Sequence, residues 1–321
     1  MNSSFIVQHS SFINLVNKKV IAEKIATLTG HNSSIFSIIS YKSPNLFLSG
    51  AGDGWIVVWD FNDPEMGRLV AKVETQIFSL CYLADANKVI AGNMNGGVHW
   101  VDLANPTDTR NILHHQKGVF AIQKIGDSVF TAGGAGMLTR WDIAQQKTIE
   151  SLHLSNQSLR CIAYADQRNE IAVGASDHNI YLLDAETLAI KQTIKAAHEN
   201  SVFTIKYSPN QQFLMSGGRD AHLRVRDLHQ DGKEISFQPA HWYTINDIAF
   251  HPKAPIFATA SRDKTIKIWD AETYQLLKVI ETVRDQGHLN SVNRLFWSTF
   301  NDYLVSCGDD RSIMIWDIKN G

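Results

Sequence analysis

A short segment that ends in an aspartate returns seven times along the chain, and it constrains the fold more than any other feature. Its clearest copy is Ser261–Asp270, in which polar turn residues lead into alternating apolar positions that close on Trp269 and an acid. A period of about 40–45 residues with short alternating strands is typical of the blades of a β-propeller. The closing aspartates are 40 to 47 residues apart, at Asp60, Asp102, Asp142, Asp184, Asp227, Asp270 and Asp317.

Each repeat opens with an apolar segment that we expect to form the innermost strand of a blade. These segments are Ile35–Tyr41, Ile77–Tyr82, Val119–Ile125, Leu159–Tyr164, Val202–Tyr207, Ile245–Phe250 and Val292–Trp297. A turn, a second strand that runs into glycine, the aspartate-terminated strand and an outer strand complete each repeat, and glycine supplies positive φ in such turns at low cost. The pattern predicts one all-β domain over residues 1–321, with seven blades of four antiparallel strands. The expected repeats span approximately 30–72, 73–114, 115–154, 155–197, 198–240, 241–287 and 288–321.

The two ends of the chain carry complementary parts of one blade. The last repeat lacks an outer strand, whereas Val20–Leu28 has the pattern of an outer strand with no complete blade before it. Pairing between the two ends would close the ring and leave no open sheet edge there. We therefore expect residues 18–29 to supply the outer strand of the closing blade. For the N-terminal extension, residues 1–17, two roles stay open: it extends that blade or it covers its edge.

The repeats resemble those of the WD40 family, the β-transducin-like propellers, over residues 18–321. The resemblance rests on Gly-His near the start of a repeat, an aspartate at the second turn and Trp-Asp at the end. It implies a structural tetrad of hydrogen-bonded His, Ser or Thr, Asp and Trp, whose polar groups satisfy one another. The implied complete tetrads, in the first, sixth and seventh repeats, are His31, Ser49, Asp53 and Trp59; His241, Thr259, Asp263 and Trp269; and His288, Ser306, Asp310 and Trp316.

The other four repeats depart from the tetrad pattern. Ala135 takes the aspartate position beside His115, Thr131 and Trp141, and Arg226 takes the tryptophan position beside His198, Ser216 and Asp220. The second and fourth repeats are eroded, with Val73, Ala91, Asn95 and Val101, and then Ser155, Val173, Asp177 and Leu183. We expect blades two to four to depend more on apolar packing, because replacing several tetrad members together with apolar residues can be nearly neutral.

Composition excludes several classes of protein. The formal net charge is −2, so no global field favours nucleic acid or acidic membranes. Three cysteines without CxxC spacing fit neither a disulfide framework nor a zinc site, and they suit a reducing compartment. We find no secretory signal and no apolar run of about 20 residues, and we expect a cytoplasmic protein with no membrane partner. His114 and His115 lack further ligands, so neither a metal nor another cofactor is expected.

Recurrent Ser, His and Asp residues invite comparison with a hydrolase. A catalytic triad needs one exposed nucleophile with an oriented base and an oxyanion hole, whereas here the three types recur at equivalent ring positions and no GxSxG pattern occurs. The glycine clusters are not followed by GKS or GKT and fall between strands, so they are interpreted as turns. A propeller enzyme with a channel-centred site stays a remote alternative.

The resemblance also implies where a partner would bind. In WD40 proteins, the second residue of the innermost strand and the residue before the turn aspartate commonly face the upper mouth of the central channel. Four of the seven second positions are phenylalanine here. The implied partner-binding residues are Phe36, Phe78, Met94, Phe120, Arg160, Phe203, Arg219, Asn246, Arg262 and Asn293.

Exposed aromatic residues beside arginines have the composition of a binding hot spot. We therefore expect a non-enzymatic scaffold that binds a peptide or loop with apolar anchors and carboxylates or phosphates on its top face, as a monomeric propeller within a larger complex. Two alternatives stay open: the phenylalanines pack between blades or plug the channel, or the same face binds RNA or single-stranded nucleic acid. Trp242 and Tyr243 either extend the surface or pack in the core.

Overall fold

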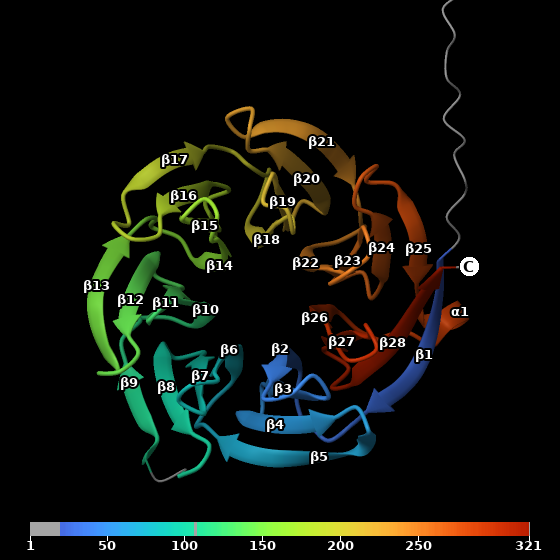
Figure 1. Ribbon diagram of the computed structural model, residues 1–321, viewed down its shortest axis with the longest axis horizontal. Coiled ribbons are helices and arrows are strands. Elements are labelled where there is room, and N and C mark those ends of the chain that lie inside the picture. Colours follow the sequence, from blue (N-terminus) through green and yellow to red (C-terminus); the bar gives the residue numbers. More distant parts are fainter. Residues whose placement is uncertain (1–19, 106–107, 321) are drawn as a thin grey trace, which may run out of the picture.

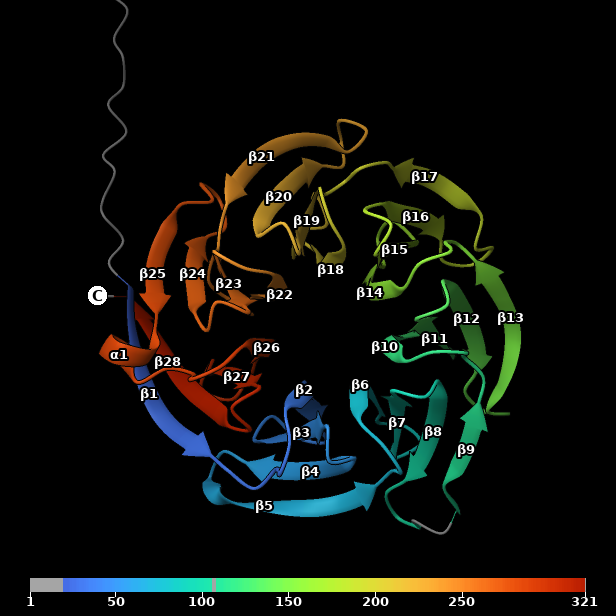
Figure 2. The ribbon, with the colours of Figure 1, turned by 180° about the vertical axis from the view of Figure 1, so that it is seen from behind.

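The computed structural model describes residues 20–105 and 108–320, which form seven four-stranded antiparallel sheets arranged in a ring (Figures 1 and 2). We call the space enclosed by their innermost strands the channel. The innermost strands line the channel: β2 (Ile35–Tyr41), β6 (Ile77–Leu83), β10 (Val119–Ile125), β14 (Leu159–Ala165), β18 (Val202–Tyr207), β22 (Ile245–Phe250) and β26 (Val292–Trp297). The second strands are β3 (Leu46–Ala51), β7 (Lys88–Asn93), β11 (Ser128–Gly133), β15 (Glu170–Ala175), β19 (Phe213–Gly218), β23 (Ile256–Ser261) and β27 (Leu304–Gly308).

The third and outer strands complete the blades. The third strands are β4 (Trp55–Asp60), β8 (Gly97–Asp102), β12 (Met137–Asp142), β16 (Ile180–Asp184), β20 (His222–Asp227), β24 (Ile266–Asp270) and β28 (Ile313–Asn320). The outer strands are β5 (Asp63–Lys72), β9 (Arg110–Leu113), β13 (Lys147–His153), β17 (Ile190–Ile194), β21 (Lys233–Pro239), β25 (Leu276–Ile280) and β1 (Val20–Leu28). Blade 1 is β2–β5, the numbering follows the chain, and blade 7 contains β26, β27, β28 and β1.

The closing blade joins the two ends of the described chain. β1 pairs antiparallel with β28, from Val20 opposite Asn320 to Leu28 opposite Ile313, with an irregularity between Lys24 and Ala26. This pairing confirms the predicted closure of the propeller by an N-terminal strand. The proposed roles of residues 1–17 concern a segment outside the described residues.

The core lies between neighbouring blades rather than within one sheet. Leu48 and Ile56 of blade 1, for example, pack with Ile77 and Val89 of blade 2, and all four are fully buried. Both faces of the middle strands are covered, so β4 is apolar along nearly its whole length, while β5 at the rim is mostly exposed. Burying a large aliphatic side chain contributes about 1.5–3 kcal/mol, so these contacts hold the blades together.

The turn between the second and third strands needs a left-handed residue in every described blade. Glycine supplies the positive φ in blades 1 to 3 without strain from a Cβ atom. The other blades use residues with side chains at the same place. The seven residues and their φ angles are Gly54 (76°), Gly96 (89°), Gly136 (80°), His178 (74°), Ala221 (63°), Lys264 (74°) and Arg311 (64°).

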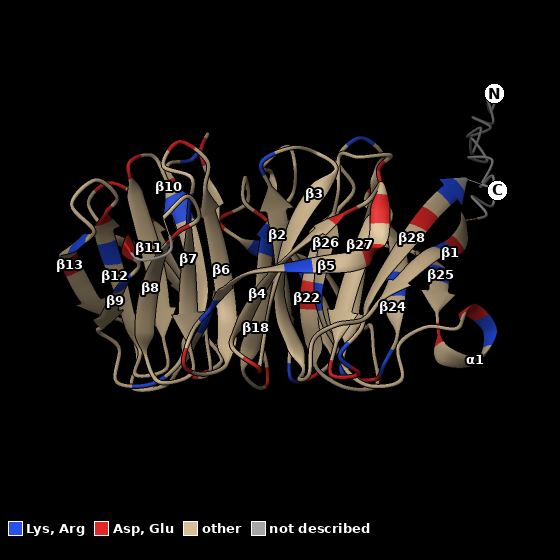
Figure 3. Ribbon diagram, turned by 90° about the horizontal axis from the view of Figure 1, so that it is seen from below, with Lys and Arg blue, Asp and Glu red and all other residues tan. Residues whose placement is uncertain are grey.

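The two faces of the disc are distinguished by their connections. We call the face that carries the loops into the innermost strands, and the turns after the second strands, the top face. The short helix α1 (Thr282–Asp285) lies on the connection from β25 to β26, so the top face points downward in Figure 3. Strand β28 ends at the opposite face. No helix among the described residues is long and apolar enough to cross a membrane.

Candidate functional site

Every innermost strand carries a β-bulge at its second residue. In blade 1, Ile35 lies opposite Ala51 and Ser37 lies opposite Gly50, so Phe36 has no partner on β3. The same register shift occurs in the other six blades. A bulge re-aims the side chain of the extra residue. The bulged residues are Phe36, Phe78, Phe120, Arg160, Phe203, Asn246 and Asn293.

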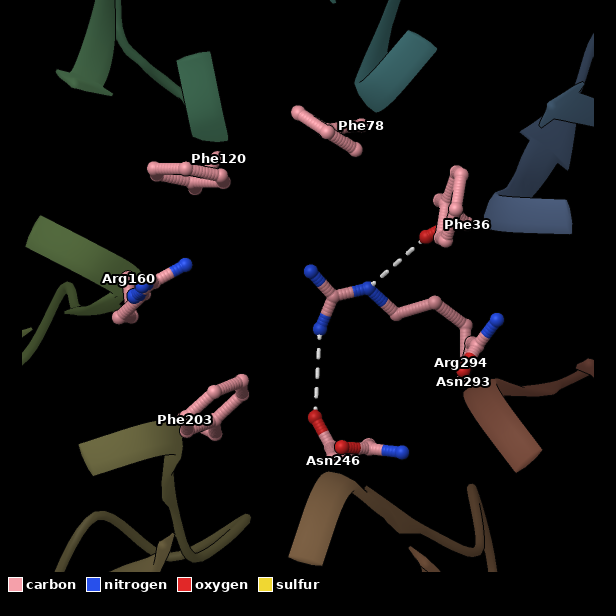
Figure 4. Close-up of a pocket in the computed structure, with 8 residues that line it drawn as sticks. All are labelled: Phe36, Phe78, Phe120, Arg160, Phe203, Asn246, Asn293 and Arg294. Carbon is pink, nitrogen blue, oxygen red and sulfur yellow. Dashed lines mark hydrogen bonds between the residues drawn. The ribbon is translucent and has the colours of Figure 1, made fainter. Parts of the chain in front are cut away.

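These seven bulged residues meet at the top of the channel. Together with Arg294 they line a cavity of about 290 Å³, which we call the channel mouth (Figure 4). Alternation along the strand, together with the resemblance to WD40 proteins, predicted that these seven residues face the channel. The structure brings them together, but it does so through the bulge, whose register depends on the neighbouring strand.

The aromatic side of the channel mouth is a run of ring contacts across three blades. Phe36 meets Phe78 edge to face at 5.3 Å between ring centroids, and Phe78 stacks on Phe120 at the same distance. Such pairs contribute about 0.5–1.5 kcal/mol beyond the buried area. All three side chains are only half-buried. The phenylalanines therefore line a cavity instead of filling the channel.

Arg160 lies between two of the phenylalanines. Its guanidinium carbon lies 4.4 Å from the ring centroid of Phe120 and 5.2 Å from that of Phe203, and Nε donates to Ser176 Oγ at 2.9 Å. These contacts hold a charged side chain in a cation–π geometry. Burial, followed by the positive charge of Arg219, lowers the pKa of Arg160 below its usual range. A negatively charged ligand would relieve both effects.

The polar side of the channel mouth joins blades 6, 7 and 1. Asn246 Nδ2 donates to Val292 O at 2.8 Å, and Asn293 Nδ2 donates to Ile35 O at 3.0 Å. Asn293 Nδ2 also donates to Asp309 Oδ1 at 2.8 Å. Both amides are engaged by neighbouring blades, so they position this wall of the cavity.

Arg294 is the lining residue that sequence reasoning missed. It extends across the cavity, where Nε donates to Phe36 O at 3.2 Å and Nη1 reaches Asn246 O at 3.5 Å (Figure 4). The sequence does distinguish Arg294, because the third residue of each of the other innermost strands is smaller than arginine. Those residues are Ser37, Ser79, Ala121, Cys161, Thr204 and Asp247.

The remaining predicted residues surround the cavity without lining it. Met94, Arg219 and Arg262 are exposed on turns between the second and third strands. Trp242 and Tyr243 are 87% and 61% exposed, which excludes the interpretation that they pack in the core. The top face therefore offers a cavity with an aromatic and a polar side, and exposed arginines and aromatic side chains lie beside it.

Tetrads of blades 1, 6 and 7 are hydrogen-bonded in the implied order. In blade 6, Trp269 Nε1 donates to Thr259 Oγ1 at 2.9 Å. The same Thr259 oxygen lies 2.7 Å from His241 Nε2, and His241 Nδ1 lies 2.9 Å from Asp263 Oδ2. The corresponding atoms of blades 1 and 7 lie within 2.7–3.2 Å of one another. The hydroxyl-bearing residues, Ser49, Thr259 and Ser306, are fully buried, so none presents a nucleophile to a substrate.

Blades 2 and 4, whose tetrads are eroded, contain polar networks that were not predicted. In blade 2, Asn93 Nδ2 lies 2.8 Å from His99 Nε2 and donates to Glu74 Oε1 at 2.9 Å. In blade 4, the hydroxyls of Ser155 and Tyr181 both donate to Asp177 Oδ2 at 2.6 Å. The expectation that these blades depend on apolar packing is therefore incomplete. Their polar groups come partly from positions outside the tetrad pattern, namely Glu74, Asn93, His99 and Tyr181.

The described residues hold no group of three or more His, Cys, Asp or Glu side chains placed to hold a metal ion. All three cysteines are free. Burial raises the pKa of Cys81 to about 11 and that of Cys161 to about 12. These thiols are therefore poor nucleophiles at neutral pH.

Comparison with known proteins gives a family model and several relatives. The model of the WD domain, G-beta repeat, matches residues 22–60, 190–227, 232–270 and 278–317. Protein tipD of Dictyostelium discoideum is 23% identical over 296 residues, which cover 90% of this chain and 48% of tipD. The human serine-threonine kinase receptor-associated protein is 26% identical over 301 residues, which cover 91% of this chain and 83% of that protein. The chain therefore spans about half the length of tipD.

Two further matches concern a shorter region and the fold. Nuclear distribution protein PAC1 of Coccidioides posadasii is 30% identical over 181 residues, which cover 53% of this chain and 37% of PAC1. The crystal structure of the WD40 β-propeller domain of Doa1 superposes with a TM-score of 0.82 at 18% identity, covering 93% of this chain and 97% of that domain. The likeness to Doa1 concerns the fold.

Proposed function

This chain belongs to the WD40-repeat family, and from that premise we propose that it is a non-enzymatic scaffold that binds a segment of another protein at the channel mouth. One observation carries the proposal: four phenylalanines and two arginines, supplied by six different blades, surround one open cavity on the top face. Aromatic and arginine side chains dominate binding hot spots, particularly in pockets that exclude water. The relatives named for receptor association and for nuclear distribution are consistent with a scaffold.

The size of the channel mouth suits one anchor of a peptide. Its volume of about 290 Å³ lies at the lower limit of small-molecule sites, which span about 300–1,000 Å³. The aromatic wall would take an apolar side chain, and the rest of the peptide would cross the top face. Trp242, Tyr243, Arg219 and Arg262 are exposed there and would supply further contacts.

The charge of the channel mouth favours a hydrogen-bond acceptor. Neither aspartate nor glutamate is among the residues that line the cavity. Within the described chain, the terminal nitrogens of Arg160 make no hydrogen bond, since its one bond uses Nε. A guanidinium pairs well with a carboxylate, and such charge-assisted bonds are about twice as strong as neutral ones. We propose that the bound segment carries an acidic residue next to its apolar anchor.

A triple substitution on three neighbouring blades tests the site. Phe36→Ala/Phe78→Ala/Phe120→Ala should remove the aromatic wall and abolish partner recovery in affinity purification from the native source. The matched control is Met66→Ala/Leu113→Ala/Ile149→Ala, which removes exposed apolar side chains from the outer strands of the same three blades. Circular dichroism would establish that both variants are folded. Equal recovery of every partner with both variants would refute binding at the channel mouth.

A second variant separates charge from shape. Arg160→Gln/Arg294→Gln keeps the aromatic wall and removes both guanidinium groups, so acidic partners should be lost while the fold is kept.

Binding of single-stranded RNA would be measured by fluorescence anisotropy at low salt. We expect no binding, because the chain has a net charge of −2. If the protein binds RNA and the triple substitution of Phe36, Phe78 and Phe120 removes that binding, the channel mouth binds nucleic acid and the scaffold proposal is wrong.

A further inference from the structure

Blade 3 contains a buried histidine whose outer nitrogen has no hydrogen-bond partner. In blades 1, 5, 6 and 7 the histidine Nδ1 lies 2.8–3.1 Å from an aspartate oxygen. In blade 3 that position is Ala135, and His115 Nδ1 makes no hydrogen bond within the described chain. His115 is 4% exposed. An unpaired polar atom of this kind costs about 1–3 kcal/mol.

The hydrogen bonds on the other side of the ring assign the proton. Trp141 Nε1 can only donate, and it donates to Thr131 Oγ1 at 2.9 Å. The Thr131 hydroxyl has no other acceptor among the described residues, so its proton is directed to His115 Nε2, which lies 2.8 Å away. Nε2 therefore accepts and Nδ1 carries the proton of the neutral ring. Burial, with His114 nearby, lowers the pKa of His115 to about 4, which keeps the ring neutral at pH 7. The unpaired atom is thus a donor that needs an acceptor.

A cavity lies where the aspartate side chain would stand. It has a volume of about 310 Å³ and is lined by His114, His115, Gln116, Ala135, Met137 and His153. It opens on the top face, because its walls are the connection into β10 and the turn after β11.

Residues whose counterparts in other blades donate backbone N–H groups to a carboxylate line the same cavity. In blade 6, the Asp263 carboxylate accepts hydrogen bonds from the backbone N–H groups of Trp242 and Thr265. Trp242 directly follows the histidine of the tetrad, and Thr265 lies two residues after the aspartate. Blades 1, 5 and 7 repeat both bonds. The corresponding residues of blade 3 are Gln116 and Met137, and both line the cavity. The residues whose counterparts hold a carboxylate elsewhere in this chain therefore lie around Ala135.

We propose that this cavity binds a carboxylate from outside the chain, in the position that the turn aspartate has in blades 1, 5, 6 and 7. The acid completes the network from Trp141 through Thr131 to His115, and it gives the neutral imidazole N–H an acceptor. Its source is the side chain of a protein partner or a small free carboxylate. The site is independent of the channel mouth, because none of its lining residues belongs to that cavity.

Nuclear magnetic resonance of the ¹⁵N-histidine-labelled protein tests the site directly. Acetate should shift the Nδ1–H signal of His115 downfield in a saturable way, whereas chloride at the same ionic strength should not. The variant Ala135→Asp supplies an internal carboxylate, so it should show the shifted signal without acetate and give no response to it. His115→Gln assigns the signal by removing it. This readout reports His115 alone and does not depend on whether the channel mouth binds a partner.

A short peptide with one aspartate, capped at both ends, distinguishes the sources of the acid. Binding that is at least tenfold tighter than that of acetate would assign the site to a partner's side chain, and equal affinity would assign it to a small carboxylate. The proposal is overturned if Ala135→Asp shows the shifted signal while neither acetate nor the peptide moves the His115 signal of the wild type.

Discussion

At the scale of single residues, the His–Asp pairs of blades 5 and 6 hold a histidine with a lowered pKa beside an aspartate with a lowered pKa. Burial by itself would raise the pKa of Asp220, but the hydrogen bond and charge of His198 lower it to about 2. Burial also lowers the pKa of His198, against the opposing effect of Asp220. Both folded-state pKa values therefore lie below the ordinary values of about 3.9 and 6.5. A proton is bound more weakly by the folded protein at both sites.

These shifts predict how stability depends on pH. A group with a lowered pKa stabilises the fold above its ordinary pKa, and that contribution is lost as the pH falls through the folded-state value. The histidines with a lowered pKa are His31, His115, His198 and His241, and for these the loss begins below pH ~6.5. For Asp220, Asp263 and Asp310 it begins below pH ~4. The folded-state pKa is about 4 for His115 and about 2 for Asp220, so at these two sites the loss continues to about those pH values. We expect the free energy of unfolding, measured in urea, to fall steadily between these limits. A stability that is flat from pH 7 to pH 3 would contradict the assignment.

Asp220→Asn tests one of these pairs at neutral pH. The substitution removes the charge that His198 and the backbone N–H groups of Glu199 and His222 contact. We expect a loss of roughly 1–3 kcal/mol in the free energy of unfolding. The control is Asp85→Asn, which changes an exposed aspartate and should be close to neutral. Equal stability of the two variants would show that the pair contributes little.

At the scale of the strand, the β-bulge explains how the fold makes a cavity from residues that a regular strand would place elsewhere. The bulge falls at the same residue in seven innermost strands of the described chain. Small residues on the second strand make room for it. A Cβ atom at Gly174 would lie 2.6 Å from Cys161 Sγ and 2.8 Å from Val202 of the next blade. Glycine is needed here for close approach and not for its φ angle.

The closing strand β1 can be tested by one substitution. Leu28, the last residue of β1, is buried, and it packs with Ile313 of β28 and with Ile35 and Trp59 of blade 1. Leu28→Ala should destabilise the protein by about 2–5 kcal/mol, because the space it leaves closes only in part. Ile25→Ala, on the exposed side of the same strand, is the matched control. Equal midpoints of unfolding in urea for the two variants would contradict a structural role for the closure.

Sequence predicts the strands well because their signals are local. The apolar segments are bounded by turn residues, and the structure starts each innermost strand at the residue that the repeat pattern predicts. The channel-mouth residues were also found, although the bulge that aims them depends on pairing with another strand. Arg294 and the networks around Asn93 and Asp177 were missed for a related reason. Their contacts join residues that only the three-dimensional register brings together.

At the scale of the whole molecule, the closed ring presents a preformed cavity at the place where we propose that a partner binds. The cavity walls are held by hydrogen bonds between blades, such as Arg294 to Phe36 and Asn246 to Val292. A preformed site lowers the entropic cost of binding, because few side chains must be ordered. The channel mouth and the carboxylate site of blade 3 open on the same face, so one extended partner can engage both.

The central claim is that the channel mouth is the surface that contacts a partner. Photo-crosslinking in cells tests it most directly, with the photoreactive residue benzoylphenylalanine replacing Phe203 in the channel mouth or Leu113 on the exposed outer strand β9. We predict that the Phe203 position captures a discrete partner, that Arg160→Gln/Arg294→Gln removes this adduct, and that the Leu113 position captures none. Capture of the partner from the Leu113 position, with no adduct at the Phe203 position, would contradict the account.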